Sequence, residues 1–154
     1  MAGVRRLLFV ERECGVLASV TAGSVMSSPP ITVGVESSIM DAARAMYEGN
    51  VGSIVVVDDR GRLAGILTRR DLIYLVASGE IARNPPVRVY MSESVITCRP
   101  DEPLLAVAER MRGAGVRHVV VVDPSDPARP VGVVSLWDIL RVLAGRCMDL
   151  LGFE

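Results

Sequence analysis

The sequence contains no lysine and no glutamine, and all seventeen of its basic residues are arginine. Eighteen acidic residues outnumber them, which gives a net charge of −1. A general nucleic-acid-binding protein needs a basic excess, so this function is not expected. Aromatic residues make up only 4% of the chain whereas 50% of it is hydrophobic, so aliphatic residues and methionine must form the core. The 154 residues suffice for one ordinary domain or two small ones.

Histidine and cysteine are scarce as well. His118 is the only histidine, and Cys14, Cys98 and Cys147 lie far apart without a C-x-x-C spacing. This pattern predicts neither a disulfide framework nor a metal site, and we expect reduced thiols. No cofactor is expected to be required. We expect no enzymatic activity, because no cysteine has a plausible base partner and no pair of acidic residues stands out.

Long hydrophobic runs are absent. In the N-terminal segment MAGVRRLLFVERE, two arginines precede an apolar run that ends at Glu11 and is too short for a signal peptide. No run approaches the roughly 20 residues that a membrane-spanning helix needs. We therefore expect a soluble, cytoplasmic protein without membrane contact.

What the chain does contain is an internal repeat. Residues 25–58 recur in register as residues 90–123, and the second copy then has two extra residues in the turn PSDPARP. Beyond this turn the matching positions are Gly65 with Gly132, Thr68 with Ser135, and Asp71 with Asp138. A change of spacing at one turn is what a duplicated unit with a variable loop should show.

Both copies have the same predicted order of elements. Apolar residues at helical spacing predict helices from about Ile39 and Leu104, and two Val- and Ile-rich runs after each helix predict a hairpin. A second helix follows each hairpin, over about residues 69–77 and 136–144. With a short leading strand, each copy is a β-α-β-β-α unit, and the fold class is α+β. A unit of about 60 residues buries too little surface alone, so we expect the two to pack through their sheets with pseudo-twofold symmetry.

The repeat also predicts the domain bounds. We expect an N-terminal extension over residues 1–20, a first unit over 21–78 and a second over 89–146, with a tail over 147–154. Residues 79–88 are the predicted linker, because Pro85 and Pro86 prevent the preceding helix from continuing.

The repeated hydroxyl and carboxylate have two interpretations. Thr68 and Ser135 stand where a strand ends and a helix begins, so each can cap the helix, with Asp71 or Asp138 completing a capping box. A helix N-terminus also favours phosphate, and a nearby carboxylate can accept the hydroxyls of a ribose. The same residues would then form one edge of a nucleotide site.

Several motifs in the two copies resemble those of the cystathionine β-synthase (CBS) domain. VMSSPPITV and VGSIVVVDDRGRLAGILTRRDL in the first copy, and VYMS, VITCRP, VRHVVVVD and GVVSLWDI in the second, carry the resemblance. It covers about residues 21–145, and two such domains in tandem are similar to a Bateman module. The resemblance implies a regulatory module that binds adenine nucleotides or adenosine derivatives in two clefts between the domains. It also implies a homodimer and an unidentified regulated protein.

The resemblance implies that each cleft combines residues of both copies. One cleft would use Thr97 and Val116 for adenine, Asp71 for ribose, and Thr68, Arg117 and His118 for phosphate, with assistance from Arg69 or Arg70. The other would use Thr32, Val51, Gly52, Ser53, Ser135 and Asp138.

Only the first of these clefts has cations at the phosphate positions, because Gly52 and Ser53 stand where Arg117 and His118 stand in the second copy. Arginine suits forked, charge-assisted bonds to phosphate. We therefore expect the phosphorylated ligand in the Arg117/Asp71 cleft. The Ser53/Asp138 cleft should be empty, weaker, or suited to a less charged adenosine derivative.

The sequence leaves the ligand open. AMP, ADP or ATP is favoured, with S-adenosylmethionine or methylthioadenosine as the alternative. A ligand-free structural or interaction module remains a competing interpretation, and single-stranded RNA binding through the arginines is a weaker one.

Overall fold

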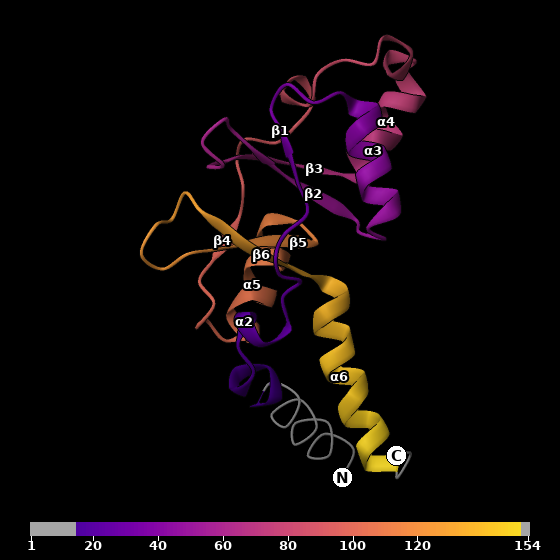
Figure 1. Cartoon of the computed structure of the whole chain (residues 1–154). Helices are drawn as coiled ribbons and strands as arrows, with labels where there is room; N and C mark the ends of the chain where they lie inside the picture. Colours follow the sequence, from indigo (N-terminus) through magenta and orange to yellow (C-terminus); the bar gives the residue numbers. More distant parts are fainter. Residues whose placement is uncertain (1–14, 152–154) are drawn as a thin grey trace. The chain divides into compact units, whose positions relative to one another are not determined.

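The computed structural model describes residues 15–151, with side chains as far as residue 145. Cys14 and the side chain of Cys147 therefore lie outside the described residues. The described chain divides into two compact units, and Figure 1 shows their elements. One unit consists of Ser28–Val95 and Val122–Gly132; the other consists of residues 15–27, 96–121 and 133–151. No helix among the described residues is long and apolar enough to cross a membrane.

The first three-stranded sheet belongs to the first repeat and has the order β1-β2-β3. Its elements are β1 (Thr32–Gly34), α3 (Ile39–Glu48), β2 (Ser53–Val57), β3 (Leu63–Thr68) and α4 (Arg69–Ser78). β1 runs parallel to β2, which pairs antiparallel with β3. The helices α3 and α4 lie side by side in Figure 1, and their buried residues share one core with the strands. That core includes Ile39, Ile54, Leu67 and Leu75.

The second sheet has the matching order β4-β5-β6. Its repeat contains β4 (Thr97–Cys98), α5 (Leu104–Ala114), β5 (His118–Val122), β6 (Pro130–Ser135) and α6 (Leu136–Leu151). β4 runs parallel to β5, as β1 does to β2. The α+β class and the β-α-β-β-α order of both repeats are therefore confirmed. α6 continues past the predicted end at Ala144 because one glycine, Gly145, does not stop a helix.

Each sheet is completed by a segment of the other repeat, which the hydrophobic pattern does not reveal. In the unit of β1–β3, Ser92 of the second repeat pairs with Ile66 of β3 through two backbone hydrogen bonds of 2.9 and 3.0 Å. The predicted linker packs on the same unit. It forms the short helices η1 (Glu80–Arg83) and η2 (Val87–Val89), and the N–H of buried Val87 donates to the carbonyl of Ser37 at 2.8 Å.

The reciprocal arrangement holds in the unit of β4–β6. Ser27 of the first repeat pairs with Val133 of β6 through hydrogen bonds of 3.0 and 3.1 Å. The short helix α2 (Ala22–Val25) joins the same unit, where the N–H of Ala22 donates to the carbonyl of Glu102 at 2.8 Å. The segments that precede β1 and β4, which we call the leading segments, are thus exchanged between the repeats. This is one reason why the compact units interleave in sequence; Val122–Gly132 of the second repeat also belongs to the unit of the first.

The exchanged segment also explains why residue 65, in β3, is a glycine. A Cβ at Gly65 would lie 2.9 Å from the carbonyl oxygen of Ser92 and 2.6 Å from the sulfur of Met91. Any side chain at residue 65 would therefore push the exchanged strand away from β3.

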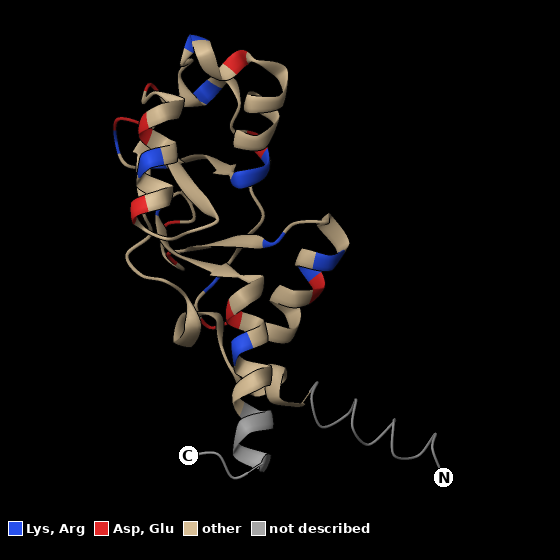
Figure 2. Ribbon diagram, turned by 90° about the vertical axis from the view of Figure 1, so that its right-hand side faces the viewer, with Lys and Arg blue, Asp and Glu red and all other residues tan. Residues whose placement is uncertain are grey.

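Charge is distributed without a dominant sign. Figure 2 shows arginines and acidic residues scattered along the ribbon, with no extended region of one colour. This distribution agrees with the net charge of −1.

Candidate functional site: two strand-to-helix corners

The predicted site residues, apart from Thr32 and Thr97, lie at two matching places where a hairpin leads into a helix. We call residues 51–53 with 68–71 corner 1, and residues 116–118 with 135–138 corner 2. Each corner is described within its own compact unit.

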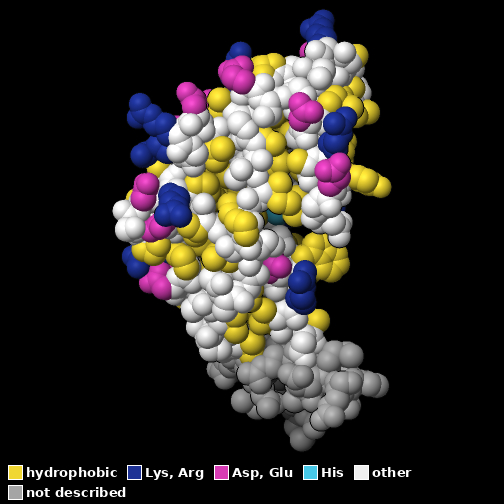
Figure 3. Space-filling model, in the orientation of Figure 1, with side chains coloured by type: hydrophobic (Ala, Val, Ile, Leu, Met, Phe, Trp, Pro, Cys, Tyr) yellow, Lys and Arg dark blue, Asp and Glu magenta, His cyan; other side chains and the backbone are white. Residues whose placement is uncertain are grey.

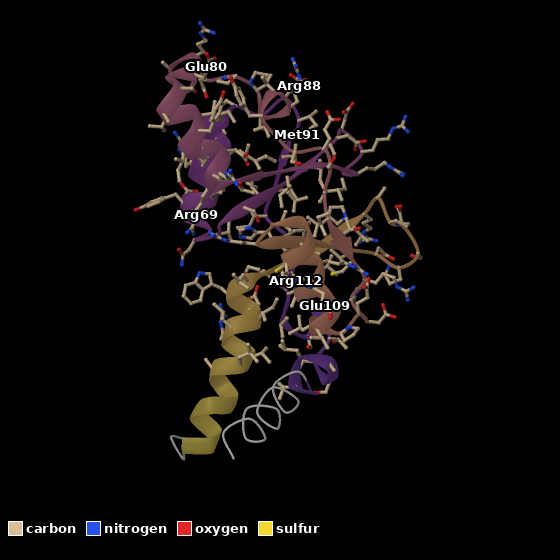
Figure 4. All side chains as sticks on the ribbon, turned by 180° about the vertical axis from the view of Figure 1, so that it is seen from behind. Arg69, Glu80, Arg88, Met91, Glu109 and Arg112 are labelled. Carbon is tan, nitrogen blue, oxygen red and sulfur yellow. The ribbon has the colours of Figure 1, made fainter. Side chains whose placement is uncertain are left out.

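Corner 1 is held by its backbone. Thr68 ends β3 and caps α4, and both its N–H and its hydroxyl donate to Oδ2 of Asp71 at 2.7 Å. Ser53 lies opposite Thr68 across the strand pair, and the N–H of Arg69 donates to the carbonyl of Gly52 at 3.1 Å. The guanidinium-bearing residues Arg69 and Arg70 are exposed on the first turn of α4; Figure 4 labels Arg69 there.

Corner 2 repeats this geometry. The N–H and hydroxyl of Ser135 donate to Oδ2 of Asp138 at 2.7 and 2.6 Å, and the N–H of Leu136 donates to the carbonyl of Arg117 at 2.9 Å. Asp138 is only 8% exposed. Its Oδ1 lies 3.7 Å from the guanidinium of Arg141, a residue that the sequence analysis did not single out. The i,i+3 spacing of this pair on a helix was the available signal.

The capping interpretation is confirmed at both corners. A third hydroxyl–carboxylate pair shows that this pattern alone does not indicate a ligand site. Ser38 and Asp41 form the same S-x-x-D pattern at the start of α3. The Ser38 hydroxyl donates to Asp41 at 2.7 Å, and the Asp41 N–H donates back at 3.1 Å. Ser38 follows a turn rather than a hairpin strand, so the pattern occurs in this chain outside the predicted site. The box provides helix capping in all three places, and ligand binding needs further support.

The threonines of the leading strands differ between the repeats. Thr32 lies opposite Val55 and is exposed, whereas Thr97 lies opposite Val120 and is half-buried. The carbonyl of Thr97 accepts a hydrogen bond of 2.8 Å from the guanidinium of Arg110.

Arg110 is in turn held by Glu102, whose carboxylate also accepts from the N–H of Arg99 at 2.8 Å. This network holds the carbonyl of Thr97, in β4, and the N–H of Arg99, directly after β4. The first repeat has Ala45 at the position of Arg110, so it has no counterpart there. No local pattern in the sequence indicates this network, because Arg110 lies 13 residues from Thr97 in the chain.

Val51 and Val116 occupy equivalent positions after α3 and α5. The N–H of Val51 donates to Met46 and that of Val116 donates to Met111, each at 3.0 Å. Of the next residues in corner 2, Arg117 is exposed and His118 is half-buried.

The structure thus brings Thr97, Val116, Arg117 and His118 into one compact unit with Ser135 and Asp138. It brings Thr32, Val51, Gly52 and Ser53 into the other with Thr68, Arg69, Arg70 and Asp71. The two predicted clefts each combine residues of both units, and they remain predictions.

Cys98 is the one cysteine whose side chain the structure describes, and it is buried. Burial, with a smaller contribution from Glu102, raises the pKa of the Cys98 thiol to about 11, so it stays protonated at neutral pH and is a poor nucleophile. Among residues 15–145, no group of three or more His, Cys, Asp or Glu side chains could hold a metal ion. What the corners offer is polar backbone at helix N-termini, carboxylates and arginines.

Comparison with known proteins adds a family pattern. The protein-family model of the CBS domain matches residues 22–78 and again residues 87–145. The crystal structure of the CBS domain pair of protein MJ0100, in complex with 5′-methylthioadenosine and S-adenosyl-L-methionine, is 34% identical in sequence. Its TM-score is 0.75 over 82% of this chain and 98% of that chain. A CBS domain protein from Pyrobaculum aerophilum complexed with AMP is 27% identical, with a TM-score of 0.71 over 82% of this chain and 99% of that one.

Several of the similar proteins are enzymes. The L-aspartate semialdehyde sulfurtransferase of Methanocaldococcus jannaschii is 35% identical over 122 residues, which are 79% of this chain. The chain spans only 23% of the length of that enzyme. The similarity is therefore to one part of the sulfurtransferase.

Proposed function

Since the chain belongs to the CBS domain family and carries the domain twice, we propose that it is a regulatory module that binds adenine nucleotides or adenosine derivatives and signals to a partner protein. The observation that carries this proposal is the hydroxyl–carboxylate box at the start of both α4 and α6. The two similar structures with bound adenosine compounds support it.

The ligand chemistry follows from the corners. The first N–H groups of a helix have no partner within it, and the helix dipole favours an anion there. In each box the Thr or Ser uses Oδ2 of the aspartate. The other carboxylate oxygen, Oδ1, would accept the ribose hydroxyls, and arginine would bind phosphate.

The proposed clefts combine the domains, with bounds 21–78 and 89–146 joined by residues 79–88. Asp71 and Thr68 act with Thr97, Val116, Arg117 and His118 in the cleft for the phosphorylated ligand. Asp138 and Ser135 act with Thr32, Val51, Gly52 and Ser53 in the other. No reaction is assigned to either cleft.

A homodimer is part of the proposal. α4 exposes Ile73, Tyr74 and Val76 to solvent, and α6 exposes Leu140. An unpartnered apolar helix face of this kind suits a second copy of the chain. We place the module in the cytoplasm, where adenine nucleotides and its regulated protein would reach it.

Calorimetric titration with AMP, ATP and S-adenosylmethionine tests the proposal. It is run on the wild type, on Asp71→Asn and Asp138→Asn, and on Asp41→Asn as the matched control, since Asp41 caps α3 in the same way. We expect an adenine ligand to bind to the wild type and the control, and to be lost in at least one corner variant. If none of the ligands binds to the wild type, the boxes are helix caps only and the search moves to protein partners.

A further inference from the structure

The two corners differ most at the first turn of the helix, immediately before the aspartate. Corner 1 has Arg69 and Arg70 there, whereas corner 2 has Leu136 and Trp137. Trp137 is 72% exposed, which is unusual for so large an apolar side chain. It is also the only tryptophan in the chain.

In the next turn, Tyr74 of α4 matches Arg141 of α6, so an aromatic residue and an arginine are exchanged in the opposite sense, but the neighbouring position is shared. Ile73 of α4 and Leu140 of α6 occupy matching positions and are both exposed and apolar. Hydrophobic side chains also reach the surface elsewhere on the face drawn in Figure 3. A protein interface common to both repeats accounts for the shared apolar positions, but it gives no reason for a change from arginine to tryptophan beside the aspartate.

Charge at corner 2 is also arranged differently. Asp138 lies 3.7 Å from Arg141, whereas Tyr74 occupies the position of Arg141 in the first repeat. Within corner 2, Arg117 contacts the start of α6 through its backbone carbonyl, which accepts from the N–H of Leu136. The side chain of Arg117 is assigned above to the cleft that contains Asp71. The first turn of α6 therefore offers a ligand one carboxylate and one indole, and the guanidinium of Arg141, one turn further on, lies against that carboxylate.

We propose that Trp137 makes the ribose site proposed at Asp138 selective for adenosine derivatives whose 5′ substituent is a sulfur group, a thioether or a sulfonium, rather than a phosphate. This inference rests on the proposed function, because it presupposes that Asp138 binds the ribose. A thioether makes favourable contacts with an aromatic ring, and a sulfonium cation is attracted to the face of an indole. A phosphate gains neither contact and loses the two arginines present at corner 1.

The sole tryptophan makes the test direct, because its emission reports on corner 2. The wild type is titrated with methylthioadenosine, S-adenosylmethionine and AMP, while calorimetry records total binding. We expect both sulfur compounds to change the emission of Trp137, and AMP to leave it unchanged. Asp138→Asn should abolish the emission change, and Asp41→Asn should retain it.

Substitution of Trp137 gives the second measurement. Trp137→Ala should lower the affinity for S-adenosylmethionine by about threefold to thirtyfold. In the same variant, the preference of the protein for S-adenosylmethionine over the neutral-sulfur analogue S-adenosylhomocysteine should also decrease. Trp137→Phe should keep most of that preference. A variant that merely weakened the fold would lose both compounds equally.

Three results would overturn the inference. If the sulfur compounds bind by calorimetry but neither the emission nor the Trp137→Ala affinity changes, Trp137 plays no part and the proposed function still stands. If AMP changes the emission as methylthioadenosine does, corner 2 is not selective. If the emission changes with protein concentration and with no ligand, the first turn of α6 is a protein interface. Absence of any binding by calorimetry would remove the proposed function itself.

Discussion

Corner 1 and corner 2 share one backbone and differ in side chains. In both, a hydroxyl residue ends a strand, donates twice to an aspartate three residues on, and is followed by an N–H that bonds to the start of the neighbouring strand. The arginines, however, stand on the helix in corner 1 and on the strand start in corner 2. The duplication has therefore kept the backbone geometry of the corner and changed the charges around it.

The largest expected effect tests whether the two repeats depend equally on their exchanged segments. Gly65→Ala should lower the free energy of unfolding by about 3 kcal/mol, because the new methyl group would overlap Ser92 and Met91. Gly132→Ala should cost about the same if β6 and Ser27 are packed as β3 and Ser92 are. Urea unfolding followed by circular dichroism measures both. Gly34→Ala is the control, since the nearest atom to its new methyl group would be 3.7 Å away; an equal loss there would refute the overlap.

The next effect concerns charge. Arg117→Gly gives corner 2 the residue of corner 1, and it should weaken AMP binding about tenfold through the loss of a charge-assisted bond. The salt dependence of binding should decrease as well. Gly52→Arg is the reciprocal change and should strengthen AMP binding to the other cleft. Unchanged AMP affinity in Arg117→Gly, measured by calorimetry at two salt concentrations, would contradict the predicted asymmetry.

A smaller effect concerns the network around β4. Arg110→Ala gives the second repeat the residue that the first repeat has, Ala45, and removes the bond to the carbonyl of Thr97. Because Arg110 is partly exposed, we expect a loss of only about 1 kcal/mol. Amide exchange of Arg99 should become faster, since Glu102 loses its partner. Arg112→Ala, on the same helix (Figure 4), should leave that amide unchanged; equal acceleration in both variants would argue against the network.

The smallest expected effect concerns the hairpin turn of the second repeat, between β5 and β6. Hydrogen bonds from the hydroxyl and N–H of Ser125 lower the pKa of Asp123. A carboxyl whose folded pKa is depressed stabilises the protein above its unfolded pKa of about 3.9, and this contribution disappears as the pH falls through the folded pKa. Asp123→Asn should therefore lower stability at about pH 6 more than at about pH 3. If the difference in stability between the wild type and Asp123→Asn does not decrease at the lower pH, the turn is not stabilised by the ionised carboxylate of Asp123.

Local pattern was enough to predict most of the fold. Hydrophobic periodicity and the register of the copies predicted the order of elements, and β5 begins and ends where the Val-rich run does. The exchanged segments could not be predicted in this way, because Ser27 and Ser92 form single isolated bridges with no run of alternating residues. Asp138 and Arg141 share a helix, but nothing local brings Arg110 to Thr97.

At the candidate site, what the sequence predicted and the structure confirms is the capping of the two helices. The motif TRRD led to the strand-to-helix corner, and the structure holds its hydroxyl and carboxylate together as a cap. The motif alone could not separate this corner from Ser38 and Asp41, where the hydroxyl donates to the carboxylate in the same way. What separates them is the preceding hairpin, which brings Gly52 beside Arg69.

The exchange of leading segments bears on how the chain can be divided. A fragment that ends at residue 79 would have a first repeat whose strand β3 lacks Ser92, and the remaining fragment would lack Ser27 beside β6. Each fragment would expose an unpaired strand edge that fits the other fragment. We expect such halves to be poorly folded in isolation and to reassemble when mixed, so that the duplicated gene product behaves as a single cooperative protein.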